Sequence, residues 1–233
     1  MQYIAKNLLD VRREIAQAEQ AADREGRTLM LAAVKYGSNE ELEALLANGV
    51  TAVGENRVQQ LLEHWSLYEA HGTKVHFIGS LQTNKVKYII DKVAMIHSVD
   101  SLRLAEVIDR QAKQHDLCMD VMIEINGARE AAKSGVMPEE AEALCRAVCA
   151  LPQLRLRGFM TMGPRFESDA LYRAYFAQVK ALGDALWQTL GLDGAPLYSM
   201  GMSESFAPAI LAGADIIRVG RRLFHQADET ANT

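Results

Sequence analysis

A single lysine, Lys35, ends the apolar run LMLAAVK and stands before a turn and a helical segment. A buried ammonium group must be paired or must lose its proton. This lysine is therefore either a strand-end charge that reaches water or an amine kept for reaction. A reactive amine in such a place would bond to a carbonyl carbon. On spacing alone the solvated lysine is favoured, because most lysines at strand ends keep their charge in water.

The segment GMSES, near the C-terminal end, has residues that could bind an oxyanion. It opens a helical pattern, and its first glycine lets a ligand approach the backbone closely. Pro208 is tolerated only within the first turn of a helix. We therefore expect Ser205 to be the N-cap and the hydroxyl of Ser203 to remain free in the loop. A plain capped helix is the structural alternative.

An arginine, Arg218, interrupts the apolar run DIIRVG. A buried guanidinium cannot neutralise itself and needs an acceptor. That acceptor is either a structural carboxylate such as Asp215 or Glu124, or a ring nitrogen or phosphate of a ligand. Gly220 and the backbone of Arg221 follow directly, and they would complete a phosphate cradle begun by the preceding loop.

These residues belong to a chain in which short apolar runs alternate with helical patterns. Strands that alternate with crossover helices form a parallel sheet buried on both faces, which explains runs that are apolar without strict alternation. Eight such runs in 233 residues predict a closed (β/α)8 barrel, with a doubly wound open sheet as the alternative. The runs are LMLAAVK, TAVG, VHFIG, VAMIHSV, MDVMIEIN, LRLRGFM, PLYSM and DIIRVG.

The ends of the helical segments are marked by serines at their starts and glycines at their ends. No Pro- or Gly-rich linker and no change of composition divides the chain, so residues 1–233 are expected to form one domain. We expect an N-terminal helix over about 1–25, a barrel over about 28–224 and a short C-terminal tail. The marking residues are Ser38, Ser101, Ser168, Gly49, Gly72 and Gly191.

In a closed barrel of this kind, functional residues lie where a strand ends and the next loop begins. This rule places Lys35 on the same face as the segments GENRVQQ, HFIGSLQTNK, NGAREAAKSG, MTMGP, SMGMSES and RVGRRLF. Loops are polar in any protein, so their polarity alone is modest support for a site. The loops after the seventh and eighth strands carry more weight, because barrels often build a phosphate site there.

The composition excludes several classes of function. A net charge of -5 gives no electrostatic reason to expect nucleic acid or an acidic membrane. No apolar stretch is long enough to span a bilayer, and the N-terminal segment is charged and helical rather than signal-like. The 3 cysteines form no CxxC pair, and their odd number argues against a secreted disulfide framework. A cytoplasmic protein without a metal site is expected.

A lysine amine, a phosphate cradle and an arginine aimed at one site suggest pyridoxal 5′-phosphate (PLP) as the ligand. At these residues the sequence resembles the YggS/PROSC family of PLP homeostasis proteins. The resemblance runs from the N-terminal helix to about Phe224. Its most specific part is HFIGSLQTNK together with SMGMS, and the other segments are GENRVQQ, KSG, RGFMTM and IIRVG.

This resemblance implies a single barrel like the N-terminal domain of alanine racemase, with PLP held as a Schiff base on Lys35. Ser203, Gly220 and Arg221 match the positions expected to hold the phosphate. Arg218 matches the arginine beside the pyridine nitrogen. Further positions that match pocket-lining residues of the family are Asn56, His76 and Met160.

The chain departs from the family pattern in three places. Arg221 replaces a common Thr or Ser, which removes a hydroxyl but keeps the backbone N–H and could add a charge-assisted bond to phosphate. Ser205 stands where an acidic residue is common, consistent with the capping role inferred above. The sequence VKYGS replaces a more usual Ser-Lys-Thr-Lys-Pro type of segment around the lysine. None of these changes removes an essential group.

Binding of PLP does not by itself imply catalysis. Racemisation needs a base on each face of the substrate α-carbon, and Lys35 serves only one face. Alanine racemase takes the opposing base from a further domain, for which this chain has no room. The cation of Arg218 beside the ring nitrogen disfavours its protonation and weakens the ring as an electron sink. We therefore expect a PLP-binding protein of vitamin B6 and amino-acid homeostasis without significant catalysis.

Two enzyme hypotheses stay open beside this one. The first is a PLP-dependent racemase or related enzyme with Lys35 as base and Tyr36 or His76 as acid, and the second is a class I aldolase. Lys85 and Lys133 are expected near the barrel mouth, where each is either a secondary PLP adduct site or a solvated lysine. The expected partners are PLP and PLP-accepting enzymes, and the expected state is a monomer or weak dimer.

Overall fold

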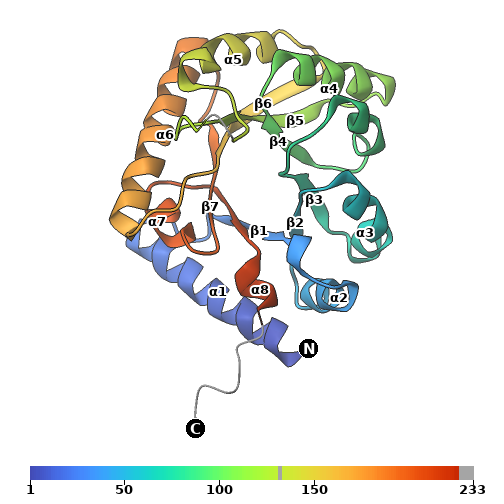
Figure 1. Ribbon diagram of the computed structural model, residues 1–233, viewed down its shortest axis with the longest axis vertical. Coiled ribbons are helices and arrows are strands. Elements are labelled where there is room, and N and C mark those ends of the chain that lie inside the picture. The colour runs from blue at the N-terminus through green and yellow to red at the C-terminus, as the bar shows by residue number, and fades with distance from the viewer. Residues whose placement is uncertain (131–132, 226–233) are drawn as a thin grey trace.

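The computed structural model describes residues 1–130 and 133–225 of the chain, and its eight strands form one closed, parallel barrel in chain order (Figure 1). The last strand pairs with the first and closes the barrel. Each of the eight apolar runs overlaps one strand, so the predicted barrel is confirmed and the open sheet is excluded. The strands are β1 (Leu29–Ala33), β2 (Ala52–Glu55), β3 (Lys74–Phe77), β4 (Met95–Val99), β5 (Met119–Ile125), β6 (Leu154–Thr161), β7 (Leu197–Met202) and β8 (Ile216–Val219).

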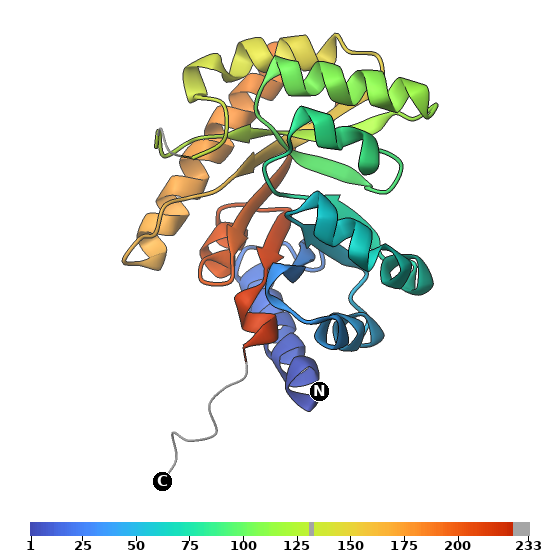
Figure 2. The same cartoon turned by 45° about the vertical axis from the view of Figure 1, so that its right-hand side comes forward.

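Helices cover the outside of the barrel (Figures 1 and 2). The N-terminal helix α1 packs against α7 and α8, beside the junction of the first and last strands. Among the described residues, no helix is both long and apolar enough to cross a membrane. The helices are α1 (Gln2–Ala21), α2 (Asn39–Ala47), α3 (Val58–His71), α4 (Leu102–Gln114), α5 (Ala141–Cys149), α6 (Asp169–Leu190), α7 (Phe206–Leu211) and α8 (Arg221–Phe224), with short 3-10 helices η1 (Val34–Tyr36), η2 (Thr83–Tyr88) and η3 (Pro138–Glu140).

The helix ends lie where the capping residues predict them. The side chains of Ser38, Ser101 and Ser168 each accept a hydrogen bond from a backbone N–H in the first turn of α2, α4 and α6. Gly72 and Gly191 end α3 and α6 in the left-handed conformation. These local signals explain why the sequence divides into elements at the observed positions.

Alternate residues of the strands form two separate apolar layers. One layer lies inside the barrel, where Leu31, Met122 and Met160 pack together. The larger layer lies between the strands and the helices, and Ile217 and Val219 of β8 belong to it. This alternation places every second side chain of a strand in the barrel interior. Near the C-terminal ends of the strands, several of those interior positions are polar.

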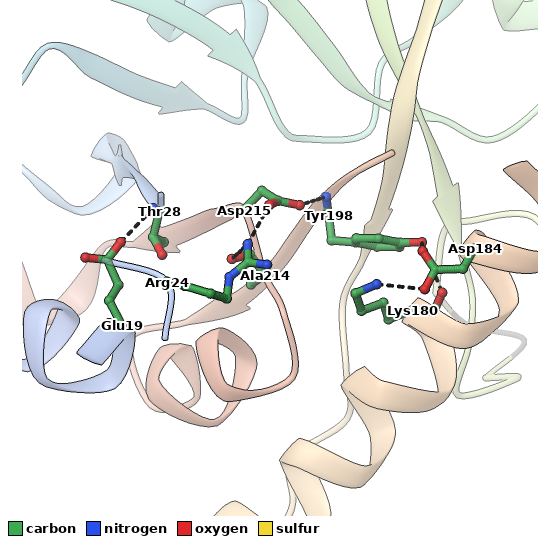
Figure 3. A network of polar contacts seen from close by, with 8 residues as sticks. All are labelled: Glu19, Arg24, Thr28, Lys180, Asp184, Tyr198, Ala214 and Asp215. Atoms are coloured by element: carbon green, nitrogen blue, oxygen red, sulfur yellow. Dashed lines mark hydrogen bonds and ion pairs between the residues drawn. The ribbon is translucent and has the colours of Figure 1, made fainter. Parts of the chain in front are cut away.

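At the opposite end of the barrel, polar contacts fasten the start of β8 to its surroundings (Figure 3). Asp215, directly before β8, accepts hydrogen bonds from Arg24 at 2.6 Å and from the backbone N–H of Tyr198 at 2.9 Å. The Tyr198 hydroxyl donates to Asp184 of α6 at 2.7 Å. Asp215 therefore has its partners at the N-terminal ends of the strands. It is not the acceptor of Arg218, which was one of the alternatives that the sequence allowed.

Replacing Asp215 with Ala is expected to lower the free energy of unfolding by about 2 kcal/mol, because it leaves a backbone N–H and a half-buried guanidinium without their acceptor. Denaturant unfolding of the purified protein measures the loss. Asp193, an exposed residue in the turn after α6, is the control, and Asp193→Ala should change the free energy by less than about 0.5 kcal/mol. Equal effects of the two substitutions would contradict a structural role for Asp215.

Candidate functional site

The C-terminal ends of the strands and their loops surround a cavity of about 230 Å³. Residues at and after the ends of β1, β2, β3, β6, β7 and β8 line it. Six of the residues that the sequence selects lie together around this cavity: Lys35, Asn56, Ser203, Arg218, Gly220 and Arg221. The rule that barrel sites form at strand ends therefore selected residues that share one cavity.

Lys35 lies in η1, immediately after β1, and its side chain lines the cavity. Burial along the run continues through Val34 and stops at Lys35, which is exposed. Its Nζ lies 4.8 Å from the ring centroid of Tyr36. In the described part of the chain Lys35 forms no ion pair. The amine of Lys35 therefore lies at the cavity, accessible and without a carboxylate partner among the described residues.

The loops after β7 and β8 are joined by a hydrogen bond at the cavity. The backbone N–H of Gly220 donates to Ser203 Oγ at 3.1 Å. Contrary to the expectation from the sequence, this hydroxyl therefore already has one partner. It accepts from Gly220 because the two loops follow neighbouring strands, and its own hydrogen remains available to an anion. Ser205 precedes α7 as expected, but its hydroxyl accepts from the N–H of Met202 at 3.1 Å instead of capping the helix.

Gly220 brings β8 into close contact with the segment that carries Lys35. A Cβ at this position would lie 2.9 Å from the carbonyl oxygen of Ala33 and 3.1 Å from Cδ2 of Tyr36. The carbonyl belongs to the backbone of β1 and cannot rotate away. A glycine is therefore required for the end of β8 to lie this close to the segment that carries Lys35.

Arg218 is buried within the barrel below the cavity and also lines it. Its Nη1 donates to the carbonyl oxygen and the Oγ of Ser199 at 2.7 and 2.8 Å, and its Nη2 donates to the carbonyl oxygen of Thr161 at 2.8 Å. Burial lowers the pKa of Arg218 to about 10, although the nearby Glu124 opposes this shift. These three hydrogen bonds leave two of its five N–H groups for a ligand.

A chain of buried side chains extends from Arg218 across the barrel. His97 Nδ1 lies 2.9 Å from Ser199 Oγ, and His97 Nε2 lies 2.8 Å from His76 Nδ1. Ser199 Oγ accepts from Arg218 Nη1, so the serine links the two histidines to the guanidinium. A neutral imidazole donates from one ring nitrogen and accepts at the other, so two neutral histidines can share the hydrogen bond between them.

The two histidines resist protonation in the folded protein. Burial is the main cause of the lowered pKa of His97, and the charge of Arg218 contributes. Burial, with a contribution from Lys74, lowers the pKa of His76 to about 4 from its ordinary value of 6.5. Above about pH 6.5, His76 is neutral in both the folded and the unfolded chain, so it adds no pH dependence there.

The free energy of unfolding is expected to fall as the pH drops from about 6.5 to about 4. Over this range the unfolded chain takes up a proton on His76 that the folded protein does not, which costs about 3 kcal/mol at the lower limit. Denaturant unfolding at pH 7.5, 6 and 5 measures the loss. His76→Gln should show a smaller loss than the parent, whereas the exposed His115→Gln should match the parent. A His76→Gln curve parallel to the parent would contradict this assignment.

His76 and Met160 do not line the cavity, contrary to the expectation from the sequence. His76 contacts His97 within the barrel, and Met160 belongs to the inner apolar layer. The cavity-lining residues on the same side are Ile78 and Met162, each two positions further along and just past the end of β3 or β6. Because alternate residues of a strand share a face, both selected residues face inward but lie one layer too deep.

Asn56, directly after β2, lines the cavity and carries an unpaired acceptor. Its side-chain oxygen Oδ1 is buried and has no hydrogen-bond partner among the described residues. A buried acceptor without a donor costs free energy, so such an atom indicates a place for a ligand donor.

The segment after β6 supplies further cavity residues. Met162 and Pro164 lie in the strand-end segment MTMGP that the sequence analysis selected, although neither was named individually. Arg165, and Tyr172 in the first turn of α6, lie beyond that segment and were not selected. The segment between β6 and α6 contains no regular element that would predict its path, so nothing in the sequence pointed to these two.

The guanidinium of Arg221 is paired with a carboxylate. Its Nη2 lies 2.6 Å from an oxygen of Glu204, the residue after Ser203. Glu204 also lines the cavity.

Neither of the two additional lysines considered from the sequence lines the cavity. Lys85 lies in η2 with its Nζ 5.7 Å from the ring centroid of Tyr88. Lys133 is 2.8 Å from a carboxylate oxygen of Glu130. Both side chains have ordinary surface partners, which favours solvated lysines.

The sequence was also compared with known proteins. Residues 7–227 match the family described as Alanine racemase, N-terminal domain. A protein of Aquifex aeolicus named Pyridoxal phosphate homeostasis protein is 37% identical over 216 residues, which cover 91% of this chain and 94% of the relative. A protein of the same name from Pseudomonas aeruginosa is 36% identical over 229 residues, covering 98% of this chain and 97% of the relative.

A solved structure has a similar fold over nearly the whole chain. PipY of Synechococcus elongatus, solved with PLP bound, superimposes with a TM-score of 0.83 at 28% sequence identity. The match covers 95% of this chain and 100% of PipY.

Proposed function

Because this chain belongs to the family of pyridoxal phosphate homeostasis proteins, we propose that it binds PLP covalently through Lys35 and serves as a reversible store of that cofactor. The observation that carries the proposal is the position of Lys35. An exposed amine without an ion-pair partner in the described residues lines the same cavity as Ser203, Gly220 and Arg218. The PLP bound to PipY supports the choice of ligand.

The residues around the cavity fit the groups of PLP. When bound, PLP supplies an aldehyde and an electron-accepting ring. The amine of Lys35 bonds to the aldehyde carbon, and the aldehyde oxygen leaves as water. Ser203 donates its hydroxyl hydrogen to the phosphate, together with the backbone N–H of Arg221, and Asn56 Oδ1 accepts from a ligand hydroxyl.

Arg218 favours storage over catalysis. Its remaining N–H groups would donate to an unprotonated pyridine nitrogen, and its positive charge would oppose protonation of that nitrogen. A ring that stays unprotonated is a weak electron sink. Lys35 can act as a base on only one face of a substrate, and His76, one of the two acids considered from the sequence, does not line the cavity. These features support a protein without significant turnover.

In this proposal the whole chain acts as one domain, in the cytoplasm, as a monomer or weak dimer. PLP leaves when an external amine or a PLP-accepting enzyme takes the aldehyde from Lys35. The proposed surroundings of the ligand include Asn56, Ser203, Gly220 and Arg221. His76 and Met160 belong to the proposal as well, in the layer beneath the ligand. The competing function is a PLP-dependent racemase that uses Lys35 as base.

The visible absorbance spectrum of the purified protein, followed by borohydride reduction and mass mapping of the modified lysine, tests the proposal. We expect a yellow protein with the pyridoxyl group fixed on Lys35 and no saturable turnover of amino acids. A colourless protein that stays unmodified after addition of PLP would refute PLP binding and favour the aldolase hypothesis. Saturable racemase turnover that is lost in Lys35→Ala would favour the enzyme.

A further inference from the structure

Glu204 lies between two arginines at the mouth of the cavity. One of its oxygens lies 2.6 Å from Arg221 Nη2, and the other lies 3.4 Å from Arg165 Nη2. The three side chains come from three separate segments, which follow β7, β8 and β6. All three line the cavity, and together they carry one net positive charge.

This charged group is attached to the residues that would hold the phosphate. Glu204 follows Ser203 directly, and Arg221 follows Gly220 directly. Two parallel links therefore join the same pair of loops: the hydrogen bond from the Gly220 N–H to Ser203 Oγ, and the ion pair of Arg221 with Glu204. The guanidinium of Arg221 is thus close to the phosphate cradle but is engaged by a carboxylate.

The ion pairs of Glu204 are weak enough to exchange partners. The side chains of Arg221 and Glu204 are 55% and 45% exposed, and that of Arg165 is 82% exposed. Ion pairs as exposed as these contribute about 0.2–1 kcal/mol. A phosphate monoester carries up to two negative charges and three strong acceptor oxygens, so it competes well against a single carboxylate for a guanidinium.

We propose that Glu204 pairs with the Arg221 guanidinium while no phosphate is bound, and that this pairing sets the affinity of the site for phosphate monoesters. When a phosphate monoester enters, Arg221 exchanges Glu204 for the phosphate, and Arg165 remains to neutralise Glu204. Because Glu204 and the phosphate compete for the same guanidinium, Glu204 keeps the affinity moderate and favours release. This inference rests on the proposed function, because it assigns a role to side chains around the same ligand.

Equilibrium titration with PLP, and displacement of PLP by inorganic phosphate, test the proposal on the full chain. Glu204→Gln is expected to bind PLP about fivefold more tightly, and Arg221→Met about fivefold more weakly. When Arg221 is already replaced by Met, Glu204→Gln should change the affinity for PLP by less than about twofold, because there is no Arg221 guanidinium for Glu204 to release. Pyridoxal, which lacks the phosphate, should bind all four proteins equally.

The matched control is Glu142→Gln on α5. Glu142 pairs with Arg146 at 2.8 Å, and the two side chains are 48% and 54% exposed, so this ion pair resembles that of Glu204 in geometry and exposure. It lies outside the cavity and should leave the affinity for PLP unchanged. If Glu204→Gln changed the affinity for PLP equally with and without Arg221, or if it weakened PLP binding, the proposed exchange of Arg221 between Glu204 and the phosphate would be wrong. Failure of the parent protein to bind PLP would instead refute the proposed function.

Discussion

The Lys35→Arg protein is expected to lose covalent capture of PLP completely. Arginine keeps the positive charge and much of the length of the lysine side chain, but a guanidinium does not condense with an aldehyde as a primary amine does. The parent protein should turn yellow with PLP and retain the pyridoxyl mass after borohydride reduction. The variant should show neither the colour nor the added mass.

Two further lysine variants serve as matched controls for this result. Lys85→Arg and Lys133→Arg should remain yellow and carry the modification on Lys35, because neither side chain lines the cavity. Labelling of Lys133 in the parent protein would show a secondary adduct site at the mouth. Full labelling of the Lys35→Arg protein at another lysine would contradict the role of Lys35.

The second large effect is expected from Gly79→Ala. A Cβ on Gly79 would lie 2.2 Å from the carbonyl oxygen of Asn56 and 2.7 Å from its Cα. These atoms are backbone, and a hydrogen bond of 2.9 Å from the Ile78 N–H to the Glu55 carbonyl oxygen holds the two segments together. The added methyl group must therefore push the two loops apart, which costs about 3 kcal/mol.

Thermal unfolding measures this cost as a fall in Tm of roughly 8 °C for a domain of this size. PLP should also bind more weakly to the Gly79→Ala protein, because Asn56 lines the cavity. Gly191→Ala is the control: its Cβ meets no atom within 4 Å, so only the left-handed backbone at φ +64 opposes it. That strain costs about 1 kcal/mol. A Gly79→Ala protein as stable as the control would contradict the collision.

Properties that depend on neighbouring residues were predictable from the sequence. The ends of α2, α4 and α6 follow from Ser38, Ser101 and Ser168, whose hydroxyls accept from backbone groups three residues away. The eight strands follow from apolar runs between those helices. Once the barrel was assumed, Lys35 and Ser203 fell at strand ends without any information on their contacts.

Properties that depend on distant residues were not predictable in the same way. His97 and Ser199 are 102 positions apart, and only closure of the barrel brings them within 2.9 Å. The acceptor of Arg218 was expected to be a structural carboxylate or a ligand group, but its acceptors within the protein are two carbonyl oxygens and a serine hydroxyl. Nothing in the local sequence of a strand indicates which interior groups it will face.

The error at His76 and Met160 has a geometric cause. Both residues point to the correct side of their strands, but depth inside a barrel depends on how far each strand extends past its neighbours. β3 ends at Phe77, and the chain beyond it still faces the cavity through Ile78. The sequence gives the face of a residue, whereas its depth is set by the register between strands.

The cavity spans the junction between the first and last strands, because Lys35 follows β1 and Gly220 follows β8. During synthesis on a ribosome, the amine is therefore made early and its phosphate cradle late. A partly made chain therefore has only one half of the proposed site, and under the proposed function PLP would load only after β8 has been inserted against β1. The bound ligand would then connect the first strand to the last and stabilise the closed barrel by mass action. The yellow colour of the protein would report the fraction of molecules that have completed folding.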